Sequence, residues 1–230
     1  MNDQVVLEGR SLVKTYVSSY ETIRVLRGAS LSVASGEIVA IVGPSGVGKS
    51  TLLHILGALD RPDDGTVLVE GVDIFSQGEK GIAAFRNSKF GFVFQFHHLL
   101  SELTALENVM MPCLIAGLDM GESRERARQM LANEVGLVGR LQHRPRELSG
   151  GEQQRVAVAR ALVMKPAVVL ADEPSGNLDP DSSIALNDLI WSLRDRHGQS
   201  FVVVTHNMEL AGRADRALKL FDGVLEAVKI

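Results

Sequence analysis

The chain has 230 residues, 45% of them hydrophobic and 23% charged, and its formal net charge at pH 7 is -4. These values are ordinary for a soluble globular protein and allow one large domain, with or without a smaller insertion. They give no overall basic charge, which disfavours nucleic acid as a partner, and the single cysteine, Cys113, excludes an internal disulfide framework.

The first part of the chain, residues 1–86, has the pattern of strands and turns. The stretch "LSVASGE" alternates and then turns, "EIVAIVG" is a short continuous apolar strand, and "GTVLVEGVDI" alternates again after the turn "RPDDG". Between them, "STLLHILGAL" is a plausible helix. We therefore expect this part to belong to an α/β core.

The pattern becomes helical at about residue 87, where stretches rich in Arg, Glu, Ala, Leu and Met begin, including "ESRERARQMLANEVG". After residue 161, the strand-like "AVVLADE" and "FVVVTH" alternate with a helix at "SSIALNDLIWSLRDRHG". Buried apolar strands that alternate with helices indicate a parallel sheet covered on both faces. We predict one α/β domain, 1–230, in which a helical insertion, 87–161, separates two parts of the core, 1–86 and 162–230.

The helix after the first of these strands has a clear apolar stripe. Leu186, Leu189, Ile190 and Leu193 follow the i, i+3, i+4, i+7 spacing of a helix face that packs on a core. Trp191 lies off this stripe, so we expect its side chain to be partly exposed.

The stretch "GPSGVGKST" has the pattern of a phosphate-binding loop, in which Gly43, four further residues and Gly48 precede Lys-Ser, after a strand and before a helix. Glycines let backbone N–H groups face the phosphates, and the helix N-terminus adds positive potential. We expect Lys49 to reach the β- and γ-phosphates and the Ser50 hydroxyl to bind Mg²⁺. The phosphate-binding residues predicted from this loop are Gly43, Pro44, Ser45, Gly46, Val47, Gly48, Lys49, Ser50 and Thr51.

Two further strands end in side chains that suit phosphate chemistry. In "VVLADEP" the strand places Asp172 and Glu173 at the carboxyl edge of the sheet, where such folds bind ligands. Asp172 would hold Mg²⁺, and Glu173 could polarise the attacking water. "FVVVTH" ends in the same way at His206. A lone histidine is more often structural, but this position makes His206 a candidate γ-phosphate sensor.

These motifs fit many nucleotide hydrolases, and the chain has no Asn-Lys-x-Asp guanine reader, which disfavours a GTPase. A second glycine turn, in "LSGGEQQRVAVARAL", distinguishes among the remaining classes because it resembles the signature of ATP-binding cassette (ABC) ATPases. The resemblance covers nearly the whole chain in the family's order. It implies a P-loop NTPase (RecA-like) core with an antiparallel β subdomain and an inserted α-helical subdomain, and ATP and Mg²⁺ as ligands.

The resemblance also assigns roles to residues. It implies that Tyr16 stacks on adenine, that Gln95 is the Q-loop glutamine with a catalytic and metal-binding role beside Ser50 and Asp172, and that Asp179 belongs to the D-loop. The signature residues are Leu148, Ser149, Gly150, Gly151 and Glu152. In the family, each signature closes over the ATP that the other chain holds, which implies a homodimer.

The segment 89–117, notably "QFHHLL" and "TALENV", resembles the ATPases of bacterial lipoprotein-releasing systems within this family. This implies a peripheral subunit on the cytoplasmic face of the inner membrane that drives integral permease subunits and releases lipoproteins for the outer membrane. The alternatives are an ATPase of a macrolide-exporter-like or cell-division complex, or a soluble ABC ATPase acting on nucleic acid or ribosomes. The longest apolar runs are far below the roughly 20 residues that span a bilayer, so a membrane role requires a partner protein.

Overall fold

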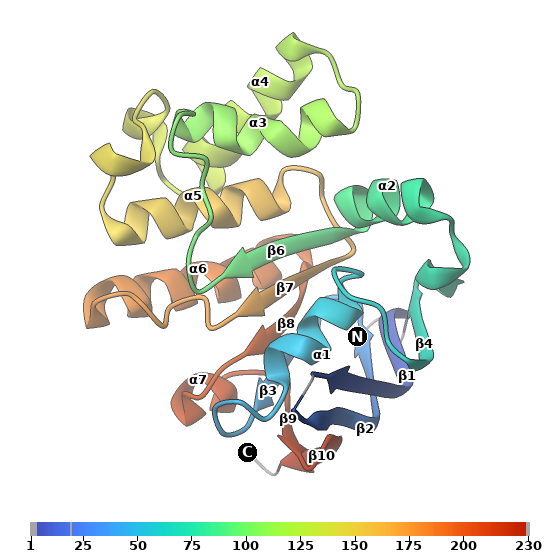
Figure 1. The fold of residues 1–230 in the computed structure, drawn as a ribbon. Helices are drawn as coiled ribbons and strands as arrows, with labels where there is room; N and C mark the ends of the chain where they lie inside the picture. Colours follow the sequence, from blue (N-terminus) through green and yellow to red (C-terminus); the bar gives the residue numbers. More distant parts are fainter. Residues whose placement is uncertain (1–3, 19, 229–230) are drawn as a thin grey trace.

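The computed structural model describes residues 4–18 and 20–228, which contain two β-sheets (Figure 1). The first is an antiparallel sheet in the order β2-β1-β4-β5, formed by β1 (Val5–Val17), β2 (Thr22–Ala34), β4 (Asp64–Val69) and β5 (Val72–Asp73). The second has the order β10-β9-β3-β8-β7-β6, formed by β3 (Ile38–Val42), β6 (Phe90–Phe94), β7 (Val168–Asp172), β8 (Ser200–Val204), β9 (Arg216–Phe221) and β10 (Val224–Val228).

The second sheet is parallel apart from one edge strand. β3 pairs in parallel with β8 and β9, β8 with β7, and β7 with β6, whereas β10 is antiparallel to β9. Every residue of β3 and of β8 is buried, which requires protein on both faces of the sheet. The expected parallel sheet and the expected fold class are confirmed.

Helix α1 (Lys49–Leu56) covers one face of this sheet and lies between it and the antiparallel sheet. Leu52, Leu53, Ile55 and Leu56 are fully buried and belong to one apolar core with side chains from both sheets. The helix that starts in the glycine loop is therefore packed on two sides, which fixes the position of the loop.

The other side of the parallel sheet carries the helices α5 (Gly150–Leu162), which packs against β6, and α6 (Pro180–His197), which packs against α5. Helices α3 (Ala105–Ile115) and α4 (Met120–Gln129) form a further layer, in which α3 packs on α5 and on α4, with short turns at Met130–Glu134, Val138–Arg140 and Pro145–Glu147 between α4 and α5. Two further helices, α2 (Glu79–Lys89) and α7 (Met208–Gly212), flank the sheet, and a further turn spans Ile74–Ser76. Among the described helices, none combines the length and the hydrophobicity needed to cross a bilayer.

Two local expectations were wrong. The first five residues after α2, Phe90–Phe94, form strand β6 of the parallel sheet, so this part of the range 87–161 is not helical. Trp191 is 8% exposed, because its indole packs between α6 and the segment before β9 and donates a hydrogen bond from Nε1 to the carbonyl oxygen of Arg213 over 2.9 Å.

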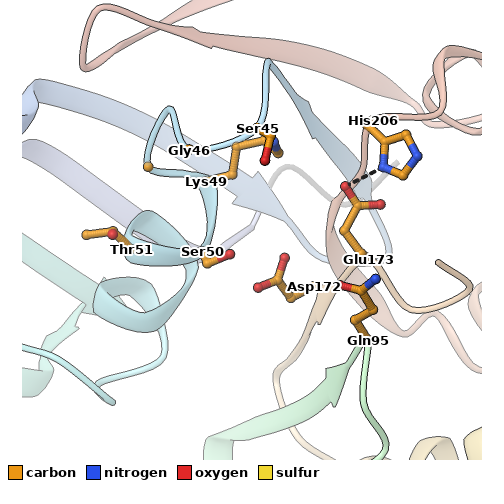
Figure 2. A pocket seen from close by; sticks show the side chains of 10 residues that line it. Ser45, Gly46, Lys49, Ser50, Thr51, Gln95, Asp172, Glu173 and His206 are labelled. Carbon is orange, nitrogen blue, oxygen red and sulfur yellow. Dashed lines mark hydrogen bonds and ion pairs between the residues drawn. The ribbon is translucent and has the colours of Figure 1, made fainter. Parts of the chain in front are cut away.

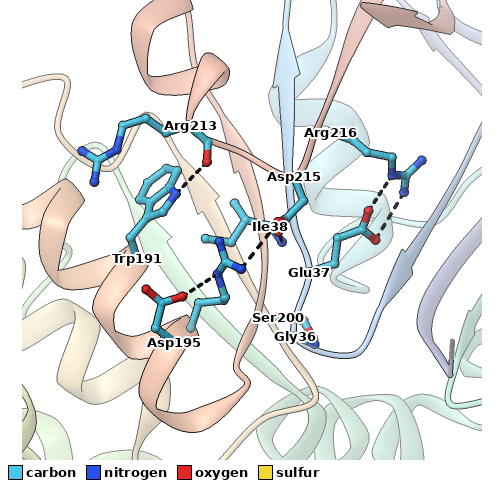
Figure 3. Close-up of polar contacts among 10 residues, drawn as sticks. Gly36, Glu37, Ile38, Trp191, Asp195, Ser200, Arg213, Asp215 and Arg216 are labelled. Carbon is cyan, nitrogen blue, oxygen red and sulfur yellow. Dashed lines mark hydrogen bonds and ion pairs between the residues drawn. The ribbon is translucent and has the colours of Figure 1, made fainter. Parts of the chain in front are cut away.

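A polar network closes the amino ends of β3 and β9, opposite to the loops described below (Figure 3). The Asp215 carboxylate accepts a hydrogen bond of 2.8 Å from the backbone N–H of Ile38, and Glu37 forms an ion pair with Arg216. These contacts join the first residues of two neighbouring strands, and so they hold the register of the sheet at the end that carries no candidate site.

The close approach of β6 and α5 gives a first prediction. A Cβ atom on Gly91 would overlap the carbonyl oxygen of Ala161 near the end of α5. Gly91→Ala should therefore lower the free energy of unfolding by about 1–3 kcal/mol, the usual cost of overpacking. Chemical denaturation measures this loss.

Gly139→Ala is the matched control, because a Cβ atom on Gly139 has no heavy atom within 4 Å in the described structure. It should leave the stability within the error of the parent. Equal stability of Gly91→Ala and the parent would contradict the tight packing of α5 on β6.

Candidate functional site

A pocket with a cavity volume of about 450 Å³ lies at the carboxyl ends of the parallel strands (Figure 2). Its lining joins the loop after β3 to the residues that follow β6, β7 and β8, because parallel strands end at a common edge. Figure 2 shows the glycine loop on one side and the four polar side chains of the strand ends on the other. The lining residues are Ser45, Gly46, Gly48, Lys49, Ser50, Thr51, Gln95, Asp172, Glu173 and His206.

The glycine loop has a shape that its sequence requires. Gly48 is the N-cap of α1 with φ 106°, in the left-handed region, and a Cβ atom there would overlap the Cγ1 methyl of Val25. The next residue, Lys49, is only 8% exposed, and its Nζ donates hydrogen bonds to the carbonyl oxygens of Gly43 and Pro44 over 2.9 and 3.0 Å. The ammonium group is thus held over the loop, where it can attract an anion.

Glu173 and His206 form a pair at the opposite side of the pocket. Glu173 Oε1 and His206 Nδ1 are 2.8 Å apart, and the Glu173 N–H donates to the carbonyl oxygen of Val204. Glu173 has φ 47°, a left-handed conformation that is uncommon for a residue other than glycine. Such backbone strain is found at functional sites. The Glu173 side chain is 16% exposed, whereas that of His206 is 73% exposed.

Gln95 is oriented by a residue that the sequence did not single out. Its Nε2 donates to Asn177 Oδ1 over 2.9 Å, and Asn177 Nδ2 donates to the backbone oxygen of Gln95 over 3.3 Å. Because the amide nitrogen is engaged, Oε1 is the atom that remains for the pocket. Asn177 belongs to "SGNLD", and a side chain that binds a residue 82 positions away leaves no local signal in the sequence.

The oxygen atoms in the pocket suit a magnesium ion. Ser50, Gln95 and Asp172 offer a hydroxyl, an amide carbonyl and a carboxylate, all hard ligands, from the start of α1 and from the ends of β6 and β7. The described residues contain no group of three His, Cys, Asp or Glu side chains with metal-binding geometry. Mg²⁺ keeps several waters and takes few protein carboxylates, and the hydroxyl, the amide carbonyl and the single carboxylate of the pocket form such a set.

Helix α5 binds the backbone on both sides of Gln95. Gln154, 2% exposed, donates from Nε2 to the carbonyl oxygen of Phe94 over 2.7 Å. Arg160 donates from its guanidinium to the carbonyl oxygens of His97 and His98 over 2.8 and 2.7 Å, and burial lowers the pKa of this group. The segment that carries Gln95 is therefore fixed to α5.

The second glycine turn lies outside the pocket, at the start of this same helix. Ser149 caps α5: its Oγ accepts from the Glu152 N–H over 3.2 Å, and its own N–H donates to Glu152 Oε2 over 2.9 Å. Arg140 fixes the same glutamate and holds the pKa of its carboxyl below the ordinary value. None of Leu148, Ser149, Gly150, Gly151 and Glu152 lines the pocket.

Two other predicted residues also stand apart from the pocket lining. Asp179 is the N-cap of α6, where it accepts from the Ser182 N–H over 3.0 Å. Tyr16 is 44% exposed on β1, and its hydroxyl donates to Asp60 Oδ2 over 3.0 Å. The chain thus brings together the phosphate loop, Gln95, Asp172, Glu173 and His206 and leaves the tyrosine and the signature at separate places.

Comparisons with known proteins agree with this arrangement. The sequence profile of the family described as "ABC transporter" matches residues 26–176. The chain is 53% identical over 218 residues to the lipoprotein-releasing system ATP-binding protein LolD of Geobacter metallireducens, covering 95% of this chain and 96% of the relative. It is 55% identical over 208 residues to the protein of the same name in Bacteroides thetaiotaomicron, covering 90% and 95%.

Solved structures give the same picture. The ATP-binding cassette MJ0796, in a dimeric post-hydrolysis state bound to ADP and Pi, superposes with a TM-score of 0.87 at 37% identity, covering 97% of this chain and 98% of that one. A second dimeric structure of MJ0796, a bacterial ABC transporter cassette, gives a TM-score of 0.86 at 38% identity and covers 96% of each chain. The phosphate loop, the strand-end carboxylates and the second glycine turn therefore have their explanation in one family, and the chain belongs to the ABC transporter family as an ATP-binding cassette.

Proposed function

We propose that the protein binds ATP with Mg²⁺ in the pocket, hydrolyses it as a homodimer, and drives the release of lipoproteins by integral permease subunits of a bacterial inner membrane. The observation that carries the hydrolytic part is the meeting of Lys49, Asp172 and the Glu173–His206 pair in one pocket. The names of the relatives support the lipoprotein part.

The hydrogen bonds of the Lys49 side chain support the proposed binding of phosphate. Its Nζ is bound to two backbone oxygens, and charged phosphate oxygens are stronger acceptors than neutral carbonyls. ATP therefore draws this ammonium group from the loop carbonyls onto the β- and γ-phosphates. Ser50, Gln95 and Asp172 would hold Mg²⁺, which would neutralise part of the phosphate charge.

Glu173 and His206 divide the remaining work. The Glu173 carboxylate orients the attacking water and takes its proton, while His206, largely exposed at the mouth of the pocket, binds the γ-phosphate. The ion-pair distance of 2.8 Å keeps the two side chains together, so a change in one is transmitted to the other.

The signature requires a second chain. Its glycines begin a helix of 13 residues, whose first N–H groups and dipole favour an anion, but they do not line the pocket of their own chain. In a head-to-tail homodimer each signature closes over the ATP of the other chain. The dimeric cassette structures of MJ0796 support this assembly.

The location of the protein in the cell follows from the proposed permease partner, which is an integral membrane protein. We place the dimer on the cytoplasmic face of the inner membrane, peripherally bound to the permease. Segment 95–100, which includes the exposed side chains of Phe96 (66%) and Leu100 (49%), is available for that contact.

The role of Glu173 gives a second prediction. Glu173→Gln keeps the shape of the side chain but removes the base, so ATP hydrolysis should fall by about 10²–10⁴-fold while ATP binding survives. A phosphate-release assay and a nucleotide-binding titration measure the two quantities, and gel filtration should show an ATP-bound dimer that accumulates.

Glu209→Gln is the matched control, since Glu209 is exposed on α7, close in sequence to His206, and lines no part of the pocket. It should hydrolyse ATP at the parent's rate. Parental turnover in Glu173→Gln would remove Glu173 from its role.

The head-to-tail dimer gives a third prediction. Lys49→Ala and Ser149→Arg should each be inactive alone, because one lacks the phosphate-binding amine and the other has a bulky side chain at the signature. In a mixed dimer both changes fall on the same composite site, so the other site is intact and part of the activity should return. Sites built within single chains would all be broken, and mixing would restore nothing.

A crosslinking experiment accompanies the mixing experiment. If both composite sites of a dimer must be intact for ATP hydrolysis, the mixture would regain no activity even in a head-to-tail dimer. Cysteines are placed at Ser45 and Gly151, and Cys113 is buried and leaves the assay undisturbed. A bond between two chains that forms only with ATP supports the assembly. A bond within one chain contradicts it.

The lipoprotein role gives a fourth prediction. Affinity purification of the protein from native membranes should recover an integral membrane pair, and that complex in proteoliposomes should release lipoproteins when ATP is hydrolysed. The Glu173→Gln variant should capture the same pair without release. Recovery of macrolide-exporter or cell-division membrane proteins, or of ribosomes, would overturn this part of the proposal.

A further inference from the structure

Tyr16 lies on a surface that continues from the phosphate loop. It pairs with Ile23 across β1 and β2, and residues directly opposite each other in an antiparallel pair share a face. Val25, two residues further along β2, lies against the loop, because its Cγ1 methyl would overlap a Cβ atom on Gly48. Tyr16 and Ile23 are 44% and 48% exposed, so an apolar surface lies beside the loop, where the base of a bound nucleotide would be.

A carboxylate holds the outer end of the Tyr16 ring. Asp60 Oδ2 accepts from the Tyr16 hydroxyl over 3.0 Å, and Asp60 Oδ1 accepts from Lys14 Nζ over 2.8 Å. Lys14 also donates to the carbonyl oxygen of Arg61 over 2.7 Å, and its side chain is only 11% exposed. Oδ1 also accepts from the Arg61 N–H over 2.7 Å, so both oxygens of the carboxylate are engaged and the hydroxyl meets an acceptor that cannot rotate away.

The ionisation of Asp60 is consistent with this arrangement. Partial burial opposes the charged form, but the hydrogen bonds from Lys14 and Tyr16 outweigh it and keep the pKa of the carboxyl below its ordinary value. Tyr16 thus donates to a carboxylate that is charged at neutral pH, and such hydrogen bonds are stronger than neutral ones.

Asp60 also connects the two ends of the candidate nucleotide site. It follows α1, the helix that begins at Lys49 in the phosphate loop and is packed between both sheets. One rigid helix therefore fixes the amine that would bind the phosphates and, just beyond its other end, the carboxylate that holds the tyrosine.

From this geometry we propose that Asp60 is a positioning residue for ATP: it fixes the ring of Tyr16 in the orientation that receives the base. The inference rests on the proposed binding of ATP at this site. A half-exposed tyrosine without this hydrogen bond can rotate about two side-chain torsions, and ordering it on binding costs affinity. With Asp60 in place, the ring is ordered before the nucleotide arrives.

The test separates binding of the base from binding of the phosphates. Isothermal titration calorimetry in the presence of Mg²⁺ measures the affinity of the full chain for ATP and for inorganic tripolyphosphate, which has no base. Asp60→Ala and Tyr16→Phe should each weaken ATP binding by about 3- to 10-fold, the scale of the cost of ordering one side chain on binding. Both should bind tripolyphosphate like the parent.

Two further variants set the limits. Tyr16→Ala should lose about 5- to 150-fold in ATP affinity, the range for base–aromatic stacking. The double variant Tyr16→Phe, Asp60→Ala should lose no more than Asp60→Ala alone, because Asp60→Ala already removes the bond to the Tyr16 hydroxyl. Asp64→Ala is the control: it removes a carboxylate nearby, whose Oδ1 accepts only from the Gly65 N–H among the described residues, and should bind ATP normally.

The outcomes are distinct. If Asp60→Ala binds ATP like the parent while Tyr16→Ala does not, the positioning role is wrong and base stacking stands. If Tyr16→Ala also binds like the parent, stacking on Tyr16 itself is wrong. Equal loss for ATP and tripolyphosphate in Asp60→Ala, or additive losses in the double variant, would show that Asp60 acts through the fold of α1 and would overturn the inference.

Discussion

The parallel hydrogen bonding of β3, β8, β7 and β6 is the constraint on which the site depends. Phe94 lies beside Asp172, and Asp172 beside Val204, so Gln95, Glu173 and His206 follow at neighbouring positions. Paired strands are about 4.8 Å apart, so the side chains that follow their carboxyl ends meet at one edge of the sheet. A register shift of one residue between β6 and β7, or between β7 and β8, would move a carboxylate to the other face of the sheet, and the site would be lost.

Helix α5 takes part in two sites at once. Its first turn carries the signature, while Gln154 and Arg160 bind the backbone beside Gln95. Hydrogen bonds from two partly or fully buried side chains make the helix and this segment one mechanical unit. In the proposed dimer, a movement of the Q-loop against the permease would therefore move the signature over the other chain's ATP. This is a physical reason for one chain to contain two glycine turns.

Motifs with local causes could be predicted from the sequence, and contacts between distant segments could not. The phosphate loop could be predicted because the turn, the lysine and the start of the helix lie within nine residues, 43–51. The apolar runs of β3, β7 and β8 indicate a parallel sheet. Trp191 was misjudged because helical spacing ignores the segment before β9, which covers the indole from outside the helix. Asn177 and Asp60 carried no signal, since their partners, Gln95 and Tyr16, lie 82 and 44 positions away.

Both halves of the proposed composite site are ordered before ATP binds, but they lie at different places in the chain. In the half held by one chain, Lys49 already bonds the loop carbonyls, α1 is packed on two sides, and Asp60 fixes Tyr16. Binding ATP there requires an exchange of acceptors rather than folding of the loop, so the ordering cost is small. The signature is equally rigid, because Ser149, Glu152 and Arg140 bind one another, but it does not line the pocket of its own chain. In the proposed homodimer, hydrolysis would therefore depend on the meeting of two preformed surfaces, and assembly would be the step that ATP controls.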